Sequence, residues 1–216
     1  MDLFKYSDII WDWNGTLLDD VSLCSKIMNN LLVSRSLPAL SINRYKEIFT
    51  FPVKDYYIKA GHDFTEESFE KIGAEFMEEY EVKKYNCKLF PFSTEVLQKI
   101  QSLNIRQHLL SAYRAENLIK FIENYSISKY FSFVKGLDHI YADDKIEIGK
   151  ELINEITTDG TNPDVILIGD SIHDFEVANE IGTDCLLIGN GHQNIERLRK
   201  LNVPVLSDLE ELYNLL

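Results

Sequence analysis

Short apolar runs separated by amphipathic stretches most strongly restrict the fold of this 216-residue chain. The runs are DIIW (8–11), HLLS (108–111), DVILIG (164–169) and DCLLIG (184–189). Between the later runs, apolar residues recur every three or four positions, as in STEVLQKIQSL, which indicates helices. Strands that alternate with helices form parallel sheets covered on both faces. We therefore expect an α/β fold with a doubly wound parallel sheet.

One long segment departs from this alternation. Residues 23–84 contain helical patterns, with helices predicted to begin at Ser41 and Thr65, and no convincing strand. The simplest architecture is a core of residues 1–16 and 87–216 with an all-helical cap, residues 17–86, inserted after the first strand.

The charge of the chain excludes some classes of partner. It has 35 acidic and 22 basic residues, a formal net charge of -13, and no cluster of lysine and arginine. Nucleic acid and anionic membrane surfaces would be repelled. Scattered cysteines, no signal-peptide pattern and no long apolar run predict a cytoplasmic protein. The oligomeric state is not indicated by any pattern.

Polar residues stand where the predicted strands end. Asp12 and Asp170 each follow an apolar run, Ser111 ends another, and Lys145 opens a helix. The carboxyl ends of parallel strands meet at one edge of the sheet, where ligands bind. Two buried carboxylates need a neutralising cation, and Mg²⁺ binds carboxylates together with phosphate oxygens. An aspartate so placed can attack phosphorus and form a covalent intermediate.

Four segments, in this order, resemble the motifs of the haloacid dehalogenase superfamily. WDWNGTLLDD (11–20) is similar to its first motif and LLSA (109–112) to its second. Lys145 resembles the lysine of the third motif, and ILIGDSIHDFEVA (166–178) is similar to the fourth. The phosphoglycolate-phosphatase-like subgroup resembles the chain most. This resemblance implies a Rossmann-like core with a mobile helical cap, and hydrolysis of a small phosphorylated metabolite with Mg²⁺.

The resemblance also implies roles for individual residues. Asp12 would be the nucleophile, and its carboxylate, the backbone carbonyl of Asn14 and the side chain of Asp170 would bind Mg²⁺. Asp174 would orient water on the metal. The implied phosphate-binding positions are Gly15, Ser111, Ala112 and Lys145. Lys150 is an alternative to Lys145, which we prefer because it stands at the start of its helix.

Asn14 departs from the family pattern. Phosphatases of the family carry an aspartate at this position as general acid and base, and an amide cannot replace it in that role. General acid–base catalysis contributes about 10²–10⁴-fold in rate. Three hypotheses follow. The first is a slow or specialised phosphohydrolase that forms an aspartyl-phosphate. The second is a phosphonate hydrolase in which Lys54 of the cap forms a Schiff base with the substrate, and the third is a phosphoester-binding protein without turnover. We favour the first.

Overall fold

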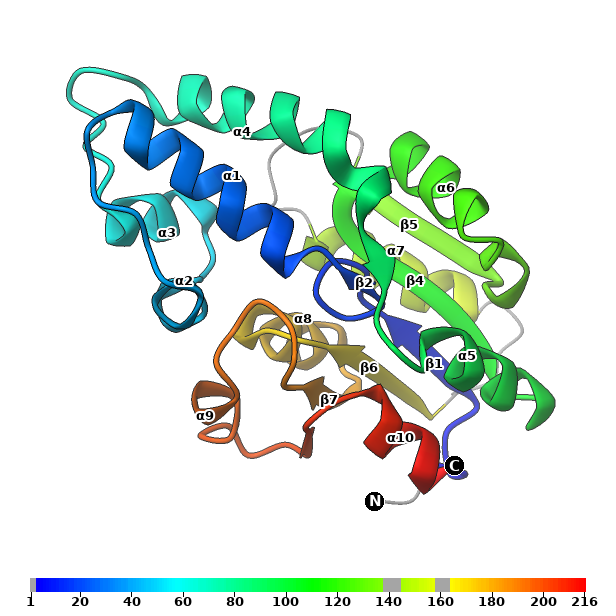
Figure 1. Ribbon diagram of the computed structural model, residues 1–216. Helices are drawn as coiled ribbons and strands as arrows, with labels where there is room; N and C mark the ends of the chain where they lie inside the picture. The colour runs from blue at the N-terminus through cyan, green and yellow to red at the C-terminus, as the bar shows by residue number, and fades with distance from the viewer. Residues whose placement is uncertain (1–2, 138–144, 158–163) are drawn as a thin grey trace.

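A parallel sheet forms the centre of the molecule (Figure 1). The computed structural model describes residues 3–137, 145–157 and 164–216. Within these residues the main sheet has six strands in the order β5-β4-β1-β6-β7-β8, all parallel. Their bounds are β1 Asp8–Trp11, β4 Arg106–Arg114, β5 Phe133–Leu137, β6 Val165–Gly169, β7 Asp184–Ile188 and β8 Val205–Leu206. The predicted doubly wound α/β fold is confirmed.

The strand order places a topological switch at β1. The chain runs from β1 outward through β4 to β5, and then returns to the other side of β1 with β6, β7 and β8. Ligands of such sheets bind beyond the carboxyl ends of the strands at this switch. The residues that follow β1 and β6 therefore lie at the expected binding edge.

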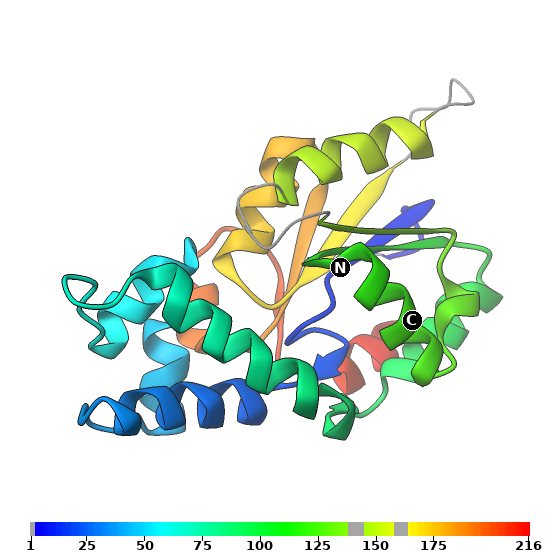
Figure 2. The ribbon, with the colours of Figure 1, turned by 90° about the horizontal axis from the view of Figure 1, so that it is seen from above.

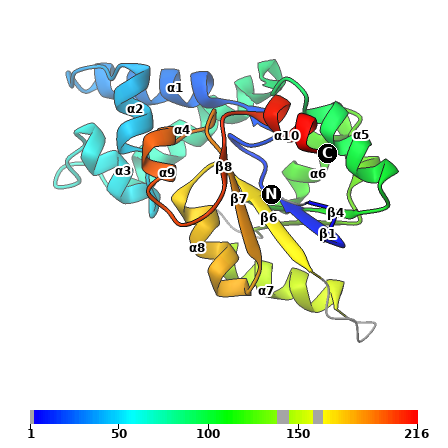
Figure 3. The ribbon, with the colours of Figure 1, turned by 90° about the horizontal axis from the view of Figure 1, so that it is seen from below.

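Helices cover both faces of this sheet, as Figures 2 and 3 show. One face carries α7 (Lys145–Ile156) and α8 (Ile172–Ile181). The other carries α5 (Ser93–Ser102), α6 (Ala115–Asn124) and α10 (Leu209–Leu215), and the short α9 (Ile195–Leu198) follows β7. In β1, Ile10 packs in the cluster with α7 and α8, whereas Ile9 and Trp11 pack in the opposite cluster. This alternation is the two-residue period of a strand buried on both faces.

Four helices form the cap, which projects from the core (Figure 1). They are α1 (Val21–Ser34), α2 (Ile42–Ile48), α3 (Val53–Ala60) and α4 (Phe69–Lys83). Their buried side chains belong to the same cluster as α5, α6 and α10, so one hydrophobic core runs from the cap into the sheet layer.

Two helix starts were predicted in the cap, and the structure confirms one of them. The start at Ser41 is confirmed, because its side chain accepts a hydrogen bond from the Arg44 N–H and caps α2. The start at Thr65 is wrong. The carboxylate of Asp63 accepts the Thr65 N–H, which forms a turn, and Ser68 caps α4 instead.

A short ribbon at the cap–core boundary was not predicted. Leu18 and Asp19 form β2, which pairs antiparallel with Lys88 and Leu89 of β3. Strands of this length carry no periodicity that a sequence reveals. The boundaries of core and cap, residues 1–16, 17–86 and 87–216, remain a prediction. In the described ranges, no helix combines the length and apolar character that a membrane span requires.

The central strand β6 should dominate core stability. Leu167 is fully buried, and its replacement by alanine should lower the free energy of unfolding by about 2–5 kcal/mol through lost packing and a cavity. The matched control is Leu215→Ala, because that leucine is 40% exposed. Urea unfolding measures both, and equal losses would contradict this arrangement of the core.

Candidate active site

A tight loop after β1 presents Asp12 at the switch edge of the sheet. The N–H of Asp12 still donates to the Ile168 carbonyl of β6, which holds it beside that strand. The chain then turns sharply, and Gly15 has a φ of +79°. A side chain at Gly15 would also collide with Asp170. Glycine is therefore required here both for the backbone conformation and for the close approach of the two strand ends.

The ammonium of Lys145 lies between two buried carboxylates. Its Nζ is 2.5 Å from Oδ1 of Asp12 and 2.7 Å from Oδ1 of Asp174. Thr16 donates to the other oxygen of Asp12 at 3.1 Å. Burial alone would lower the pKa of Lys145, but the two carboxylates outweigh it and raise the pKa, so the side chain is charged. The charge of Lys145 thus fixes the position of Asp12.

Asp170, directly after β6, has no such cationic partner. Its Oδ2 accepts the backbone N–H of His192 at 2.5 Å, and among the described residues no basic side chain forms an ion pair with it. Burial raises the pKa of Asp170 to about 8, although the charge of His192 opposes the shift. Burial likewise raises the pKa of Asp12 to about 6, against the opposing effect of Lys145. A buried carboxylate that makes no direct ion pair is a site that favours a cation.

Asp174 is held in place rather than left open. Its Oδ2 accepts from the backbone and hydroxyl of Ser171, at 3.0 and 2.6 Å, in a capping box that begins α8. Its Oδ1 accepts from Lys145. Burial raises the pKa of Asp174, but Lys145 and these hydrogen bonds outweigh it and hold the pKa below its usual value. Both oxygens are therefore engaged, and the side chain orients Lys145.

The carboxylate oxygens suit a divalent cation. Those of Asp12, Asp170 and Asp174 lie within 4.8 Å of one another, and all three residues are buried. Oxygen ligands with a concentrated negative charge are the set that Mg²⁺ and similar hard cations take. Asp170 is the most open of the three, because it accepts only a backbone N–H, whereas Lys145 and Ser171 occupy Asp174. Asp12 would share its oxygens between the cation and its hydrogen bonds from Lys145 and Thr16.

Comparison with known proteins now identifies the family. A family model described as haloacid dehalogenase-like hydrolase matches residues 9–188, which include both carboxylates and Lys145. The chain belongs to the haloacid dehalogenase-like hydrolase family. The predicted resemblance is thereby confirmed.

Individual relatives resemble this family member along most of their length. A phosphoglycolate phosphatase of Rhodobacter capsulatus is 22% identical over 189 residues, which cover 86% of this chain and 85% of the relative. A haloacid dehalogenase-like hydrolase of Streptococcus pneumoniae superposes with a TM-score of 0.80 at 17% identity, covering 99% and 100% of the two chains. A haloacid dehalogenase-like protein of unknown function from Agrobacterium tumefaciens gives 0.78 at 18% identity, covering 96% of each. At these identities the two structures support the shared fold alone.

Two further predicted site residues, Ser111 and Ala112, follow the central part of β4. The register pairs Leu109 with Trp11, so Ser111 and Ala112 lie at the same edge as Asp12. Ser111 is buried and its hydroxyl accepts the Tyr113 N–H at 3.1 Å. The role of Ser111 and Ala112 in phosphate binding stays a prediction.

The two alternative lysines lie away from the carboxylates. Lys150 is exposed and pairs with Glu147 at 2.7 Å, one turn along α7 from the buried Lys145. Lys54 is exposed on α3, where its ammonium lies over the ring of Phe64. The geometry therefore supports Lys145 for the lysine role.

The loop after β7 contributes residues that sequence reasoning missed. His192 holds Asp170 through its backbone N–H, and Gly191 has no room for a side chain because Asp170 lies against it. The signal was the stretch GNGH at the carboxyl end of a strand next to β6, where loops of this fold approach ligands.

The raised pKa of Asp170 predicts a pH-dependent stability of the metal-free protein. In the folded chain Asp170 keeps a proton up to about pH 8, whereas the unfolded chain releases it near the ordinary value of 3.8. The folded state therefore binds more protons in this interval, and stability should fall as the pH rises through it. Thermal unfolding in EDTA should show this slope, and Asp170→Asn should reduce it. Mg²⁺ should raise the unfolding temperature more at the alkaline end. Identical slopes for the two proteins would contradict the account of Asp170.

Proposed function

We propose that the protein is a divalent-metal-dependent phosphohydrolase that acts on a small phosphorylated metabolite. The observation that carries the proposal is the buried group formed by Asp12, Lys145 and Asp170 at the switch edge of the sheet. The similarity to a phosphoglycolate phosphatase supports the same reaction class.

Asp12 is the nucleophile in this proposal. One carboxylate oxygen forms a bond to phosphorus while the bond from phosphorus to the ester oxygen breaks, and the electron pair leaves with that oxygen. Lys145 and Thr16 hold the carboxylate in a single orientation, which favours in-line attack. Water then attacks the phosphorus of the aspartyl-phosphate, which releases phosphate, restores the carboxylate and gives up its proton to the medium.

In this proposal, positive charge provides most of the stabilisation of the transition state for phosphoryl transfer. Lys145 lies within hydrogen-bond distance of the attacking group, so its ammonium can neutralise a phosphoryl oxygen as the transfer proceeds. Mg²⁺, held by Asp12, Asp170 and the backbone carbonyl of Asn14, would supply further charge neutralisation when bound. Ser111 and the backbone around Gly15 and Ala112 are proposed to hold the other phosphoryl oxygens.

The side chain of Asn14 does not provide a proton. Its amide donates to Oδ2 of Asp20 at 2.8 Å and contacts the Tyr80 hydroxyl at 2.7 Å. The leaving oxygen must therefore depart without a general acid at this position, which restricts efficient turnover to good leaving groups.

Two other hypotheses make different predictions. A binding protein would hold phosphate and Mg²⁺ without turnover. A phosphonate hydrolase would form a covalent adduct with a cap lysine that borohydride traps. The exposed position of Lys54, with its ammonium over Phe64, gives no support to that second chemistry.

Turnover of p-nitrophenyl phosphate with and without Mg²⁺ tests the proposal. The wild type should release phosphate only with the metal, and Asp12→Asn should reduce release to the background. Lys145→Met should lower kcat by about 10²–10³-fold, the typical cost of a lost charge-stabilising donor. Thermal unfolding establishes that each variant is folded. Metal-independent turnover, or an active Asp12→Asn protein, would overturn the mechanism.

The missing acid should be visible in the choice of substrate. Alkyl phosphates, whose leaving groups need a proton, should react about 10²–10⁴-fold more slowly in kcat/KM than aryl phosphates. A series of phosphate esters with graded leaving-group acidity measures this dependence. Similar rates across the series would show that another group protonates the leaving oxygen.

A further inference from the structure

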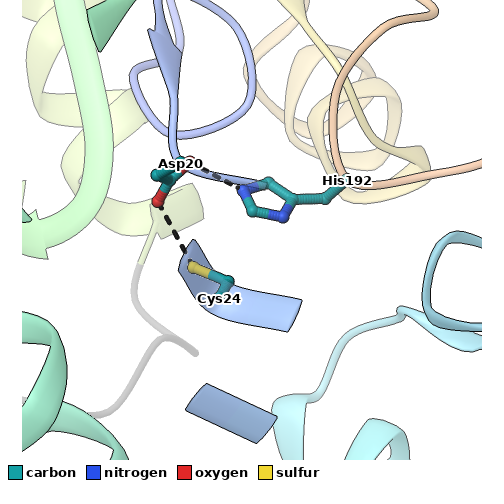
Figure 4. Close-up of side chains that lie close together, drawn as sticks. All are labelled: Asp20, Cys24 and His192. Carbon is teal, nitrogen blue, oxygen red and sulfur yellow. Dashed lines mark hydrogen bonds and ion pairs between the residues drawn. The ribbon is translucent and has the colours of Figure 1, made fainter. Parts of the chain in front are cut away.

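A second buried carboxylate, Asp20, lies at the junction between the core and the cap. It precedes α1 and is 1% exposed. Its oxygens accept hydrogen bonds from Asn14 at 2.8 Å, Tyr80 at 2.9 Å and Cys24 at 3.4 Å, and contact Nε2 of His192 at 3.0 Å. Figure 4 shows Asp20 with the histidine and the cysteine on either side.

The partners of Asp20 come from separate parts of the chain. Asn14 belongs to the loop that presents Asp12, and Tyr80 belongs to cap helix α4. His192 belongs to the loop that holds Asp170, and its other ring nitrogen contacts the hydroxyl of Tyr45 from cap helix α2 at 2.8 Å. Asp20 thus joins both catalytic-edge loops to two helices of the cap.

The atoms around Asp20 that could bind a metal ion are already used in these hydrogen bonds. Asp20, Cys24 and His192 offer oxygen, sulfur and nitrogen atoms within 4.8 Å, a set that a transition metal could take. However, both oxygens of Asp20 and both ring nitrogens of His192 have partners. The cluster is therefore complete as a hydrogen-bonded group without an ion.

The charge of Asp20 restricts the residue at position 14. The amide of Asn14 donates a hydrogen bond to Oδ2 of Asp20. An aspartate at position 14 would place a second carboxylate at this distance with no hydrogen to share, inside a buried site. The junction between the core and the cap can therefore hold one carboxylate, and in this chain that carboxylate is Asp20.

We propose that Asp20 is a positioning residue that fastens the Asp12 loop to the cap, and that Asn14 is its obligatory uncharged partner. Asp20 acts through Asn14, whose backbone belongs to the loop that places the nucleophile. The departure from the family pattern at position 14 is then the counterpart of the carboxylate at position 20. The structural pairing stands on its own contacts, whereas its effect on catalysis rests on the proposed function.

Three variants test the pairing through stability: Asn14→Asp, Asp20→Asn and the double exchange Asn14→Asp/Asp20→Asn. The first puts two carboxylates in the junction and should lower Tm by roughly 5–15 °C. The double exchange restores one carboxylate and one amide, so it should recover at least half of that loss. If Asn14→Asp does not fold, recovery of folding in the double variant is the equivalent result. Additive losses would overturn the pairing.

Kinetics test the positioning role. Asp20→Asn, measured below its own unfolding temperature, should lower kcat roughly tenfold, since misplacing a reactive group costs up to about 10²-fold. It should also raise the Mg²⁺ concentration for half-maximal rate, while KM for p-nitrophenyl phosphate changes less than kcat. Asp19→Asn is the matched control, because this neighbouring carboxylate is exposed and should leave all three values unchanged.

The two experiments separate the failure of this inference from failure of the proposed function. Unchanged kcat in a folded Asp20→Asn protein would overturn the positioning role. A wild type without phosphatase activity would overturn the proposed function, while recovery of Tm in the double exchange would still support the pairing of Asn14 with Asp20.

Discussion

The balance of charge among Asp12, Asp170, Asp174 and Lys145 controls the rest of this structure. Three carboxylates are buried within 4.8 Å of one another, and a single ammonium lies between two of them. Such a group is unfavourable in a protein interior unless the remaining negative charge is compensated. Lys145 and Ser171 engage both oxygens of Asp174, and Lys145 and Thr16 donate to Asp12. Asp170 accepts a hydrogen bond from the backbone N–H of His192. The arrangement is thus suited to bind a cation and an anionic phosphoester together.

The sheet and the cap bring this group together from distant positions. Asp12 and Asp170 directly follow neighbouring strands at the topological switch, and Lys145, the first residue of α7, lies at the same edge. The cap packs on the core through a shared hydrophobic cluster, and the buried polar junction at Asp20 links it to the loops that carry Asn14 and His192. The cap is therefore joined by direct hydrogen bonds to the loops that carry Asn14 and His192.

Sequence reasoning was strongest where one local pattern determines the outcome. Buried strands such as DVILIG predicted the parallel sheet, and the polar residues after them predicted the meeting of Asp12 with Lys145. It failed at Thr65, where a side chain captured a backbone N–H, and at the ribbon of β2 and β3, which is too short for a period. It also missed the contact between Asp20 and His192, which are 172 residues apart, because this contact depends on how the cap packs against the core.

The central claim is that a divalent cation binds between Asp12 and Asp170 and balances their charge. Crystals grown with Mn²⁺ and measured for anomalous scattering test it most directly. The account predicts a single strong peak within bonding distance of both carboxylates and of the Asn14 carbonyl oxygen. Carboxylates that point to separate regions, with no peak between them in a metal-saturated crystal, would contradict it.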